Sequence, residues 1–327
     1  MLNGRKRLIT ALSAIALAAA VGLVPGTAQA EPDIDDVQTR VDRLYHEAEQ
    51  ASERYNDAKL DLTELESDLD AVKADEQRQD ERLAVVQEQV EESIVRQYQG
   101  QGLSAVSQVV VSDDPQAFLS SLSTMSSFNQ FQEQLFDDYS REQKALNIRR
   151  QATKQRAAEV SKLEEQLGRE KATIDKKLDE AQSLLGRLKA EEREALLASR
   201  SSQRVPSSVS VSGRAAAAVN YAMGQVGDSY VYGAAGPSAF DCSGLTMASW
   251  AQAGVGLPHS SSAQYGSGPH VASNALQPGD LVFYYQPISH VGMYIGNGMI
   301  VHAANPGTGV VVSGVFSMPY SGAVRPG

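Results

Sequence analysis

A regular stripe of apolar residues runs along the charged first part of the chain. Its members recur in alternating steps of four and three residues, the heptad spacing of a coiled coil: Val37, Val41, Leu44, Ala48, Ala51, Tyr55, Ala58, Leu62, Leu65, Leu69 and Val72. Glu76 and Gln79 interrupt the stripe, which resumes in phase beyond them. The pattern predicts a helix over residues 35–98, roughly 95 Å long at 1.5 Å per residue. A helix of this length cannot bury its stripe alone, so it needs a partner.

A second amphipathic run supplies that partner. Its apolar positions are Val160, Leu163, Leu167, Ile174, Leu178, Ala181, Leu185 and Leu188. Gly100 and Gly102 end the first helix, and the more apolar stretches 103–111 and 118–136 are expected to form short helices at one end of the hairpin. Residues 31–200 are therefore predicted to form an antiparallel coiled-coil hairpin. We expect its charged side chains to be a solvated face, with contact to a partner as the alternative role.

The last third of the chain differs in composition. Residues 205–327 hold 19 of the 26 glycines and very few charged side chains. Before them, the Ser-rich segment 201–213 shows no apolar periodicity and is predicted to be a flexible linker. We expect a helix over 214–226, a second helix that begins at Cys242, and strands at 280–285, 290–295, 299–303 and 310–315. Helices followed by consecutive antiparallel strands make an α+β arrangement.

The start of the chain predicts export. Residues 5–7 are basic, residues 8–24 are apolar, and Ala-Gln-Ala at 28–30 offers the small side chains that a signal peptidase requires. We expect residues 1–30 to be a cleaved signal peptide rather than an uncleaved anchor. The mature protein is then expected to be secreted, in the cell wall or at the outer face of the cytoplasmic membrane. The net charge of −11 argues against nucleic acid as a partner.

Candidate chemistry gathers around Cys242, the one cysteine of the chain, which leaves no intramolecular disulfide. Asp241 is a suitable N-cap, so Cys242 would begin a helix whose partial positive charge favours the thiolate. His290 and His302 flank the Gly-Asn-Gly turn at 296–298 and are expected on adjacent antiparallel strands. His290 is then the candidate base for the thiol, and His302 the residue that orients it. A small, inert buried thiol is the alternative.

The same side chains raise the question of a metal site. Cys242, His290 and His302 are zinc-ligand types, but zinc needs a further ligand and we expect no carboxylate in place to supply it. We therefore expect no metal ion and no cofactor. His259 and His270 lie in a polar loop and are expected at the surface, at the rim of a substrate cleft.

Five short motifs follow one another through this region. They are Tyr-Val-Tyr-Gly at 230–233, Phe-Asp-Cys-Ser-Gly-Leu at 240–245, Leu-Gln-Pro-Gly-Asp-Leu-Val-Phe-Tyr at 276–284, His-Val-Gly-Met-Tyr-Ile-Gly at 290–296 and Val-His-Ala-Ala-Asn at 301–305. The set resembles the NlpC/P60 cell-wall peptidases, and the resemblance implies a papain-like α+β catalytic domain over residues 214–327. It also implies that Cys242 is the nucleophile, His290 the base, His302 the third polar residue and Tyr230 a donor in the oxyanion site. The loop at 258–262 departs from the arginine that many members carry after the proline.

The resemblance further implies a function. The family's usual reaction is hydrolysis of the bond between D-isoglutamate and the diamino acid in peptidoglycan stem peptides. The order of signal peptide, coiled coil and peptidase is similar to that of cell-separation endopeptidases, whose coiled coil is a regulatory arm under a membrane complex of the FtsE–FtsX type. We expect a secreted cysteine endopeptidase whose coiled coil restrains or recruits it, the arm folding back across the cleft. The alternatives are a non-catalytic wall-binding or divisome-interaction protein that acts through its coiled coil, and an acyltransferase.

Overall fold

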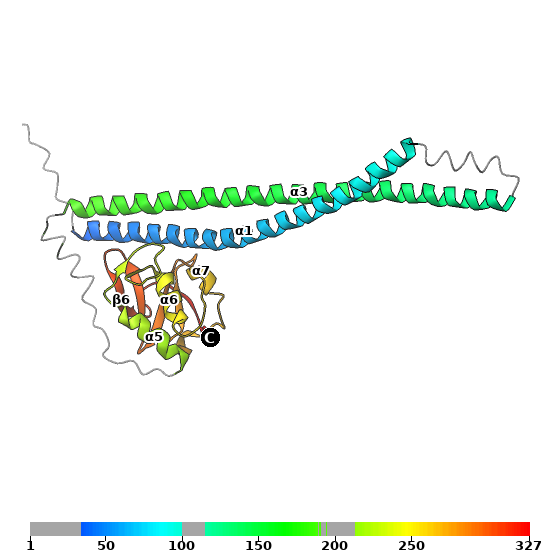
Figure 1. Cartoon of the computed structure of the whole chain (residues 1–327). Helices are drawn as coiled ribbons and strands as arrows, with labels where there is room; N and C mark the ends of the chain where they lie inside the picture. The colour runs from blue at the N-terminus through cyan, green and yellow to red at the C-terminus, as the bar shows by residue number, and fades with distance from the viewer. Residues whose placement is uncertain (1–33, 100–114, 189, 191–193, 195–212) are drawn as a thin grey trace, which may run out of the picture.

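A computed structural model describes most of the chain after its first 33 residues (Figure 1). The described residues are 34–99, 115–188, 190, 194 and 213–327. The predicted signal peptide, the short helix expected at 103–111 and residues 201–212 of the predicted linker lie outside these ranges. No helix within the described ranges combines the length and the apolar character that crossing a bilayer requires.

Two long helices form the hairpin that the heptad pattern predicts. Helix α1 (Ile34–Tyr98) and helix α3 (Pro115–Gly186) run antiparallel beside each other (Figure 1). The short helix expected at 118–136 is wrong, because this stretch is the beginning of α3, one continuous helix of 72 residues. No glycine or proline occurs between residues 116 and 167, so nothing in the backbone interrupts the helix there.

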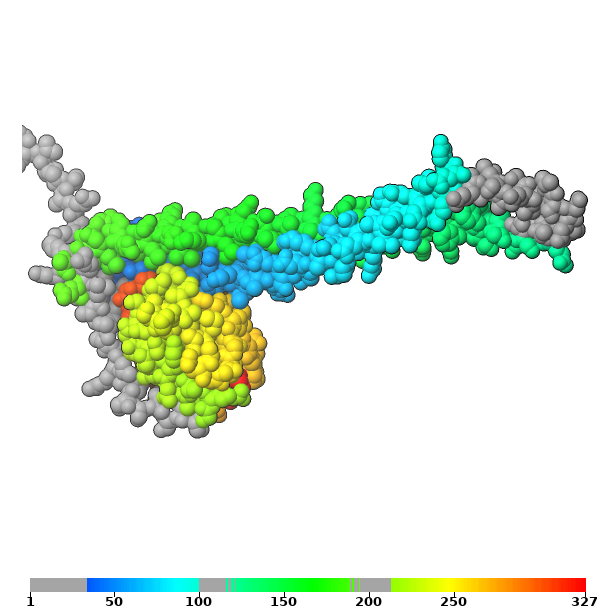
Figure 2. All heavy atoms as spheres, viewed as in Figure 1, coloured from blue at the N-terminus to red at the C-terminus, as the bar shows by residue number. Residues whose placement is uncertain are grey.

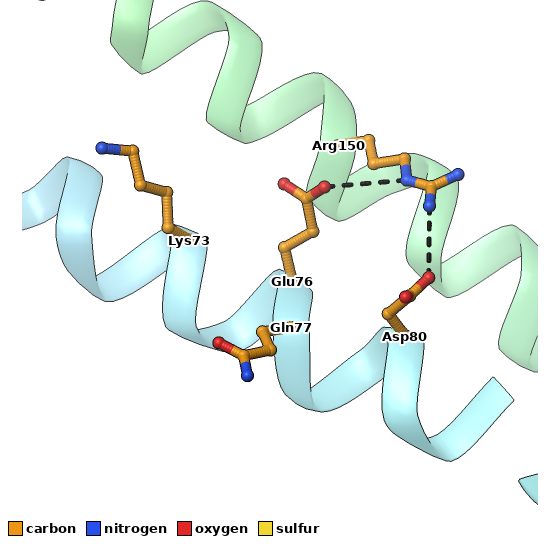
Figure 3. A pocket seen from close by; sticks show the side chains of 5 residues that line it. All are labelled: Lys73, Glu76, Gln77, Asp80 and Arg150. Carbon is orange, nitrogen blue, oxygen red and sulfur yellow. Dashed lines mark hydrogen bonds and ion pairs between the residues drawn. The ribbon is translucent and has the colours of Figure 1, made fainter. Parts of the chain in front are cut away.

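The apolar stripe is best buried where α1 begins and α3 ends. The buried cluster there comprises Val37, Val41, Leu44, Tyr45, Ala181, Leu184 and Leu188. Where Glu76 and Gln79 interrupt the stripe, polar contacts join the helices instead. Arg150 of α3 makes ion pairs with Glu76 at 3.6 Å and Asp80 at 3.2 Å (Figure 3), and the Gln79 amide donates to Glu142. Exposed ion pairs contribute little stability, so this layer mainly favours one register of the two helices.

The C-terminal domain begins with helix α5 (Arg214–Gly224). A short parallel pair, β1 (Ser229–Tyr230) and β2 (Ala239–Phe240), leads into helix α6 (Cys242–Ala251), followed by α7 (Ser261–Gln264) and the 3₁₀ turn η1 (Ser273–Ala275). Five strands close the chain: β3 (Leu281–Tyr284), β4 (His290–Gly296), β5 (Met299–Asn305), β6 (Gly309–Gly314) and β7 (Tyr320–Val324). They form one antiparallel sheet in the order β6-β5-β4-β3-β7.

This domain confirms the predicted α+β class. The predicted strands correspond to β3 to β6, and α6 begins at Cys242 as expected. Strand β7 was not predicted, since only two of its five side chains, Ala323 and Val324, are buried. The main apolar core lies between the sheet and helices α5 and α6, around Val219, Leu245 and Val301. All of its members come from the C-terminal domain, so the domain has a core of its own.

The C-terminal domain packs against the first part of α1, on a side that α3 leaves free (Figures 1 and 2). The α1 residues with side-chain or backbone hydrogen bonds to the domain are Tyr45, Glu49, Glu53, Asn56 and Asp57. They are spaced at nearly every turn and form a second, polar stripe along the helix. The expectation that the charges of α1 face solvent is therefore wrong for Glu49 and Glu53, which the domain buries.

Candidate active site

The start of α6 holds Cys242 in place. Asp241 caps the helix as predicted, its carboxylate accepting a hydrogen bond from the Gly244 N–H at 2.6 Å. The same carboxylate accepts from the Gly233 N–H at 2.9 Å, which ties the loop after β1 to the helix start. Asp241 and Cys242 are each 1% exposed, so the thiol lies at the bottom of the site and not at the surface.

Asp241 also holds His259, whose Nε2 lies 2.8 Å from a carboxylate oxygen. The expectation that His259 is a surface residue is therefore wrong, because it is partly buried against the helix cap, whereas His270 is exposed as expected. Burial alone would lower the pKa of His259, but the hydrogen bond and charge of Asp241 outweigh it, and the pKa is raised. Sequence reasoning missed this contact because the two residues are far apart along the chain.

Two histidines meet on the sheet. His290 begins β4, and His302 lies on β5, where the register pairs residue 293 with residue 301. That register puts both side chains on one face, with His290 Nε2 2.7 Å from His302 Nδ1. His302 Nε2 in turn lies 2.9 Å from the Ser313 hydroxyl of β6. Burial, then the charge of His290, holds the pKa of His302 well below its usual value, so this imidazole is neutral.

This chain of contacts fixes which nitrogen of His290 faces the thiol. A neutral His302 that donates from Nε2 to Ser313 accepts from His290 through Nδ1. The Nδ1 atom of His290 is then the nitrogen left for chemistry. Sequence reasoning missed Ser313, although its signal was present: a lone hydroxyl in the apolar run Val310 to Val315 lies on the same strand face as the position opposite His302.

Glu49 of α1 is hydrogen-bonded to the Nδ1 atom of His290. One of its carboxylate oxygens lies 2.5 Å from His290 Nδ1. The ligand atoms of Glu49, Cys242 and His290 all lie within 4.8 Å of one another, so thiol, imidazole and carboxylate form one buried cluster. Burial raises the pKa of Glu49, but the charge and hydrogen bond of His290, aided by His46, outweigh it and the pKa is lowered. Glu49 is therefore an anion paired with His290.

Glu53, one turn further along α1, covers the thiol itself. Its carboxylate accepts from the Ser243 hydroxyl at 2.8 Å, from the Ser261 backbone N–H, and weakly from Cys242 Sγ at 3.7 Å. Burial and the neighbouring charge of Asp241 raise the pKa of Glu53 to about 7, against the opposing effect of the hydrogen bonds from Ser261 and Ser243.

These carboxylates reverse the expected effect on the thiol. The helix start was expected to favour the Cys242 thiolate, but burial raises the pKa of Cys242 well above its usual value, and the charges of Glu53, Glu49 and Asp241 raise it further. The partial charge of a helix end changes a free energy by roughly 0.3–1 kcal/mol, which is too little against burial and the nearby carboxylates. With α1 in this position the thiol is protonated.

Tyr230 completes the cluster. Its side chain is 5% exposed, and its hydroxyl has no hydrogen-bond partner within the described part of the chain. The ring stands edge-on to Tyr232 with centroids 4.9 Å apart. Burial, then the charges of Glu49 and Cys242, raises the pKa of the Tyr230 phenol, so the hydroxyl lies beside the cluster as a neutral donor.

The C-terminal sequence matches a known family over residues 227–324, the model of the NlpC/P60 family. This part of the chain is an NlpC/P60 domain. A probable endopeptidase of Corynebacterium glutamicum is 43% identical over 109 residues, which cover 33% of this chain and 52% of the relative. A probable endopeptidase of Mycobacterium tuberculosis is 49% identical over 96 residues, which cover 29% of this chain and 25% of the relative. The chain thus spans about half the length of the first relative and a quarter of the second.

A solved structure is also similar in sequence to the NlpC/P60 domain. The structure of the peptidoglycan hydrolase RipB from Mycobacterium tuberculosis is 31% identical, covers 34% of this chain and 64% of that chain, and has a TM-score of 0.32. The family match covers residues 227–324 and includes no part of the coiled coil.

The NlpC/P60 domain brings the four sequence-predicted site residues into one buried cluster: Cys242, His290, His302 and Tyr230. Sequence reasoning missed Glu49 and Glu53. Both lie at polar positions of a charged coiled coil. At such positions the sequence around a glutamate that contacts a distant domain looks the same as the sequence around a glutamate that faces solvent.

Proposed function

We propose that the protein is a peptidoglycan hydrolase, a cysteine endopeptidase that cleaves stem peptides. The observation that carries the proposal is the buried cluster of Cys242 and His290, within 4.8 Å of each other inside an NlpC/P60 domain. A thiol beside an imidazole that a second polar group orients is the arrangement that nucleophilic catalysis on a carbonyl needs. The relatives named as probable endopeptidases, and the peptidoglycan hydrolase among the solved structures, support this substrate class.

Each side chain of the cluster has a role in the proposed reaction, and His290 acts first as a base and then as an acid. His290 Nδ1 takes the proton of the Cys242 thiol, and the thiolate attacks the scissile carbonyl carbon. The oxyanion that forms accepts hydrogen bonds from the Tyr230 hydroxyl and from a backbone N–H at the start of α6. His290 then gives its proton to the departing amine, and water hydrolyses the remaining thioester. His302, held by Ser313, keeps the His290 ring in the required orientation.

The bond we propose is the one between D-isoglutamate and the diamino acid, which is the usual substrate bond that the family resemblance implies. Residues 1–30 direct export, so the mature enzyme works in the cell wall or at the outer face of the cytoplasmic membrane. Its role is wall remodelling or separation of daughter cells.

We further propose that α1 restrains this activity. Glu49 occupies the basic nitrogen of His290, and Glu53 covers the thiol and keeps it protonated. No carbonyl carbon can approach Cys242 while these two side chains remain. Activity therefore requires α1 to leave the domain.

A membrane partner of the FtsE–FtsX type is the proposed agent of that release, acting through the coiled coil. The far end of the hairpin, where α3 begins, exposes a series of large apolar side chains: Leu119, Leu122, Met125, Phe128, Phe131 and Phe136. Exposed apolar groups in such number favour an interaction site. They lie far along the hairpin from the NlpC/P60 domain (Figure 1).

The decisive experiment uses the mature chain from residue 31 with the arm contacts removed by Glu49→Ala and Glu53→Ala. Mass analysis of stem peptides should show cleavage at the proposed bond. Adding Cys242→Ala to the same chain should lower the rate by several orders of magnitude, since the nucleophile and base act as a unit. Peptidoglycan binding without cleavage in the opened chain would instead favour the wall-binding alternative, and products with added amines would favour acyl transfer.

A further inference from the structure

The buried cluster has the composition of a metal site. Glu49 offers a carboxylate oxygen, Cys242 a sulfur and His290 a ring nitrogen, all within 4.8 Å of one another. The sequence alone did not indicate a carboxylate that could join Cys242 and His290 in binding a metal ion. The structure supplies that carboxylate from Glu49 of α1, which is 241 residues from His290 in the chain.

The three ligand atoms, all within 4.8 Å of one another, need shifts of about 1 Å to reach the spacing of a zinc tetrahedron. Bonds of about 2.0–2.3 Å to O, N and S ligands put neighbouring ligand atoms roughly 3.3–3.7 Å apart. The Glu49 oxygen and His290 Nδ1 are nearer, at 2.5 Å, because a proton joins them. A metal ion that replaces this proton moves the two atoms apart by about 1 Å, which rotation of the Glu49 side chain on the helix surface can supply.

The charge around the cluster also favours a cation. Glu49, Glu53, Asp241 and Cys242 are all buried, and the thiol keeps its proton because of this burial first and the neighbouring carboxylate charges second. A divalent cation would offset these charges and let the sulfur bind as thiolate, with release of the proton.

We propose that the closed form of the protein binds a zinc-type divalent cation through Glu49, Cys242 and His290, so that the metal links α1 to the NlpC/P60 domain. Mixed oxygen, nitrogen and sulfur ligands select Zn²⁺ or Co²⁺ over Mg²⁺ and Ca²⁺, which take oxygen ligands alone. Three protein ligands leave a fourth position for water. The Tyr230 hydroxyl, buried and without a partner among the described residues, is the group beside the cluster that such a water would satisfy.

This site exists only while α1 is in place, because Glu49 comes from α1 and the other two ligands, Cys242 and His290, come from the NlpC/P60 domain. Metal binding therefore stabilises the closed form and excludes substrate from Cys242. That regulatory consequence rests on the proposed peptidase function, whereas binding of the ion does not. The test below measures binding directly, so its failure can be told apart from failure of the peptidase proposal.

The experiment titrates the mature chain with Co²⁺ and follows the thiolate-to-cobalt absorption band in the near ultraviolet. We expect one equivalent to bind, Zn²⁺ to displace it, and Cys242→Ser to abolish the band. Glu49→Gln should weaken binding by on the order of 10- to 100-fold, since loss of even an outer-shell partner has that effect. Glu64→Gln, on an exposed position of α1, is the matched control and should bind like the unaltered chain.

Three results would overturn the inference. One is the absence of a thiolate band at stoichiometric Co²⁺ in the unaltered chain. Another is unchanged affinity in Glu49→Gln, which would mean that α1 contributes no ligand. The third is equal weakening by Glu64→Gln, which would reduce the effect to the general charge of the helix.

Discussion

Removing the Asp57 carboxylate is the cleanest way to loosen α1 from the NlpC/P60 domain. Asp57 lies at the edge of the contact and accepts hydrogen bonds from the Ser260 and Ser262 hydroxyls, the latter at 2.7 Å. It touches none of the proposed catalytic side chains, so Asp57→Ala changes closure and leaves the cluster of Cys242 and His290 intact.

The size of the effect follows from these two hydrogen bonds. A bond to a charged group contributes roughly 1.5–3 kcal/mol when buried, but Asp57 is only half-buried and solvent screens it. We take about 0.5–1.5 kcal/mol for each bond, hence about 1–3 kcal/mol for both. Since about 1.4 kcal/mol is a factor of ten, the open form should become about 5- to 150-fold more populated.

The single cysteine provides an assay that needs no substrate. Cys242 is 1% exposed in the closed form, and the chain holds no other thiol. A small alkylating reagent therefore reacts only when α1 has moved away, at a rate proportional to the open population. Asp57→Ala should raise the alkylation rate, and the rate of stem-peptide hydrolysis, by the same factor.

Asp61→Ala is the control, because Asp61 carries the same charge one turn further along α1 and is exposed. It should react like the unaltered chain. Equal alkylation rates in all three proteins would refute the idea that α1 covers the thiol in solution. Faster alkylation without faster hydrolysis would mean that the arm covers the cysteine but does not limit the reaction.

Two further predictions concern residues that pack around the start of α6, Gly244 and His259. Gly244→Ala should lower the melting temperature, because a Cβ at this position would stand 2.2 Å from the Ala234 carbonyl oxygen and overpacking costs about 1–3 kcal/mol. The control is Gly224→Ala, which should not lower the melting temperature because a Cβ there meets nothing within 4 Å. Burial and the charge of Lys59 lower the pKa of His259, but Asp241 and Glu53 outweigh them and the pKa is raised. The stabilising effect of His259 is therefore complete below its unfolded pKa of about 6.5 and is lost as pH rises through the folded value. The melting temperature of His259→Gln should thus fall below that of the unaltered chain at pH 5.5 by more than at pH 8.5; an equal deficit at both would contradict the assignment.

Periodicity and turn residues were sufficient to predict much of this architecture. The heptad stripe of α1 predicts the length of this helix to within a residue or two. It also predicts a partner helix, because a long apolar stripe must be buried against another element. The Gly-Asn-Gly turn at 296–298 predicts the β4–β5 pair, and this pair is what brings His302 to His290. Local rules were enough wherever the interaction partner was near in the sequence.

The interface between α1 and the domain could not be predicted in this way. The position of Glu49 differs in no local property from that of an exposed glutamate, since its buried state depends on a domain that begins more than 150 residues later. The same holds for the thiol pKa. A helix start predicts a lowered pKa, and only the three-dimensional arrangement shows the burial, and then the carboxylates of Glu53 and Glu49, that raise it instead.

The chemistry of this interface suits a reversible restraint. Helix α1 uses its apolar stripe against α3 and its polar stripe, Tyr45 to Asp57, against the domain. When the domain leaves, the apolar stripe stays paired, and the polar groups exchange protein hydrogen bonds for water at a net cost of only about 1 kcal/mol each. An apolar contact of the same extent would have to expose its surface to water at about 25 cal/mol per Å². If α1 restrains the enzyme as proposed, a polar interface lets a modest binding energy at the distant end of the hairpin open the site without unfolding the arm.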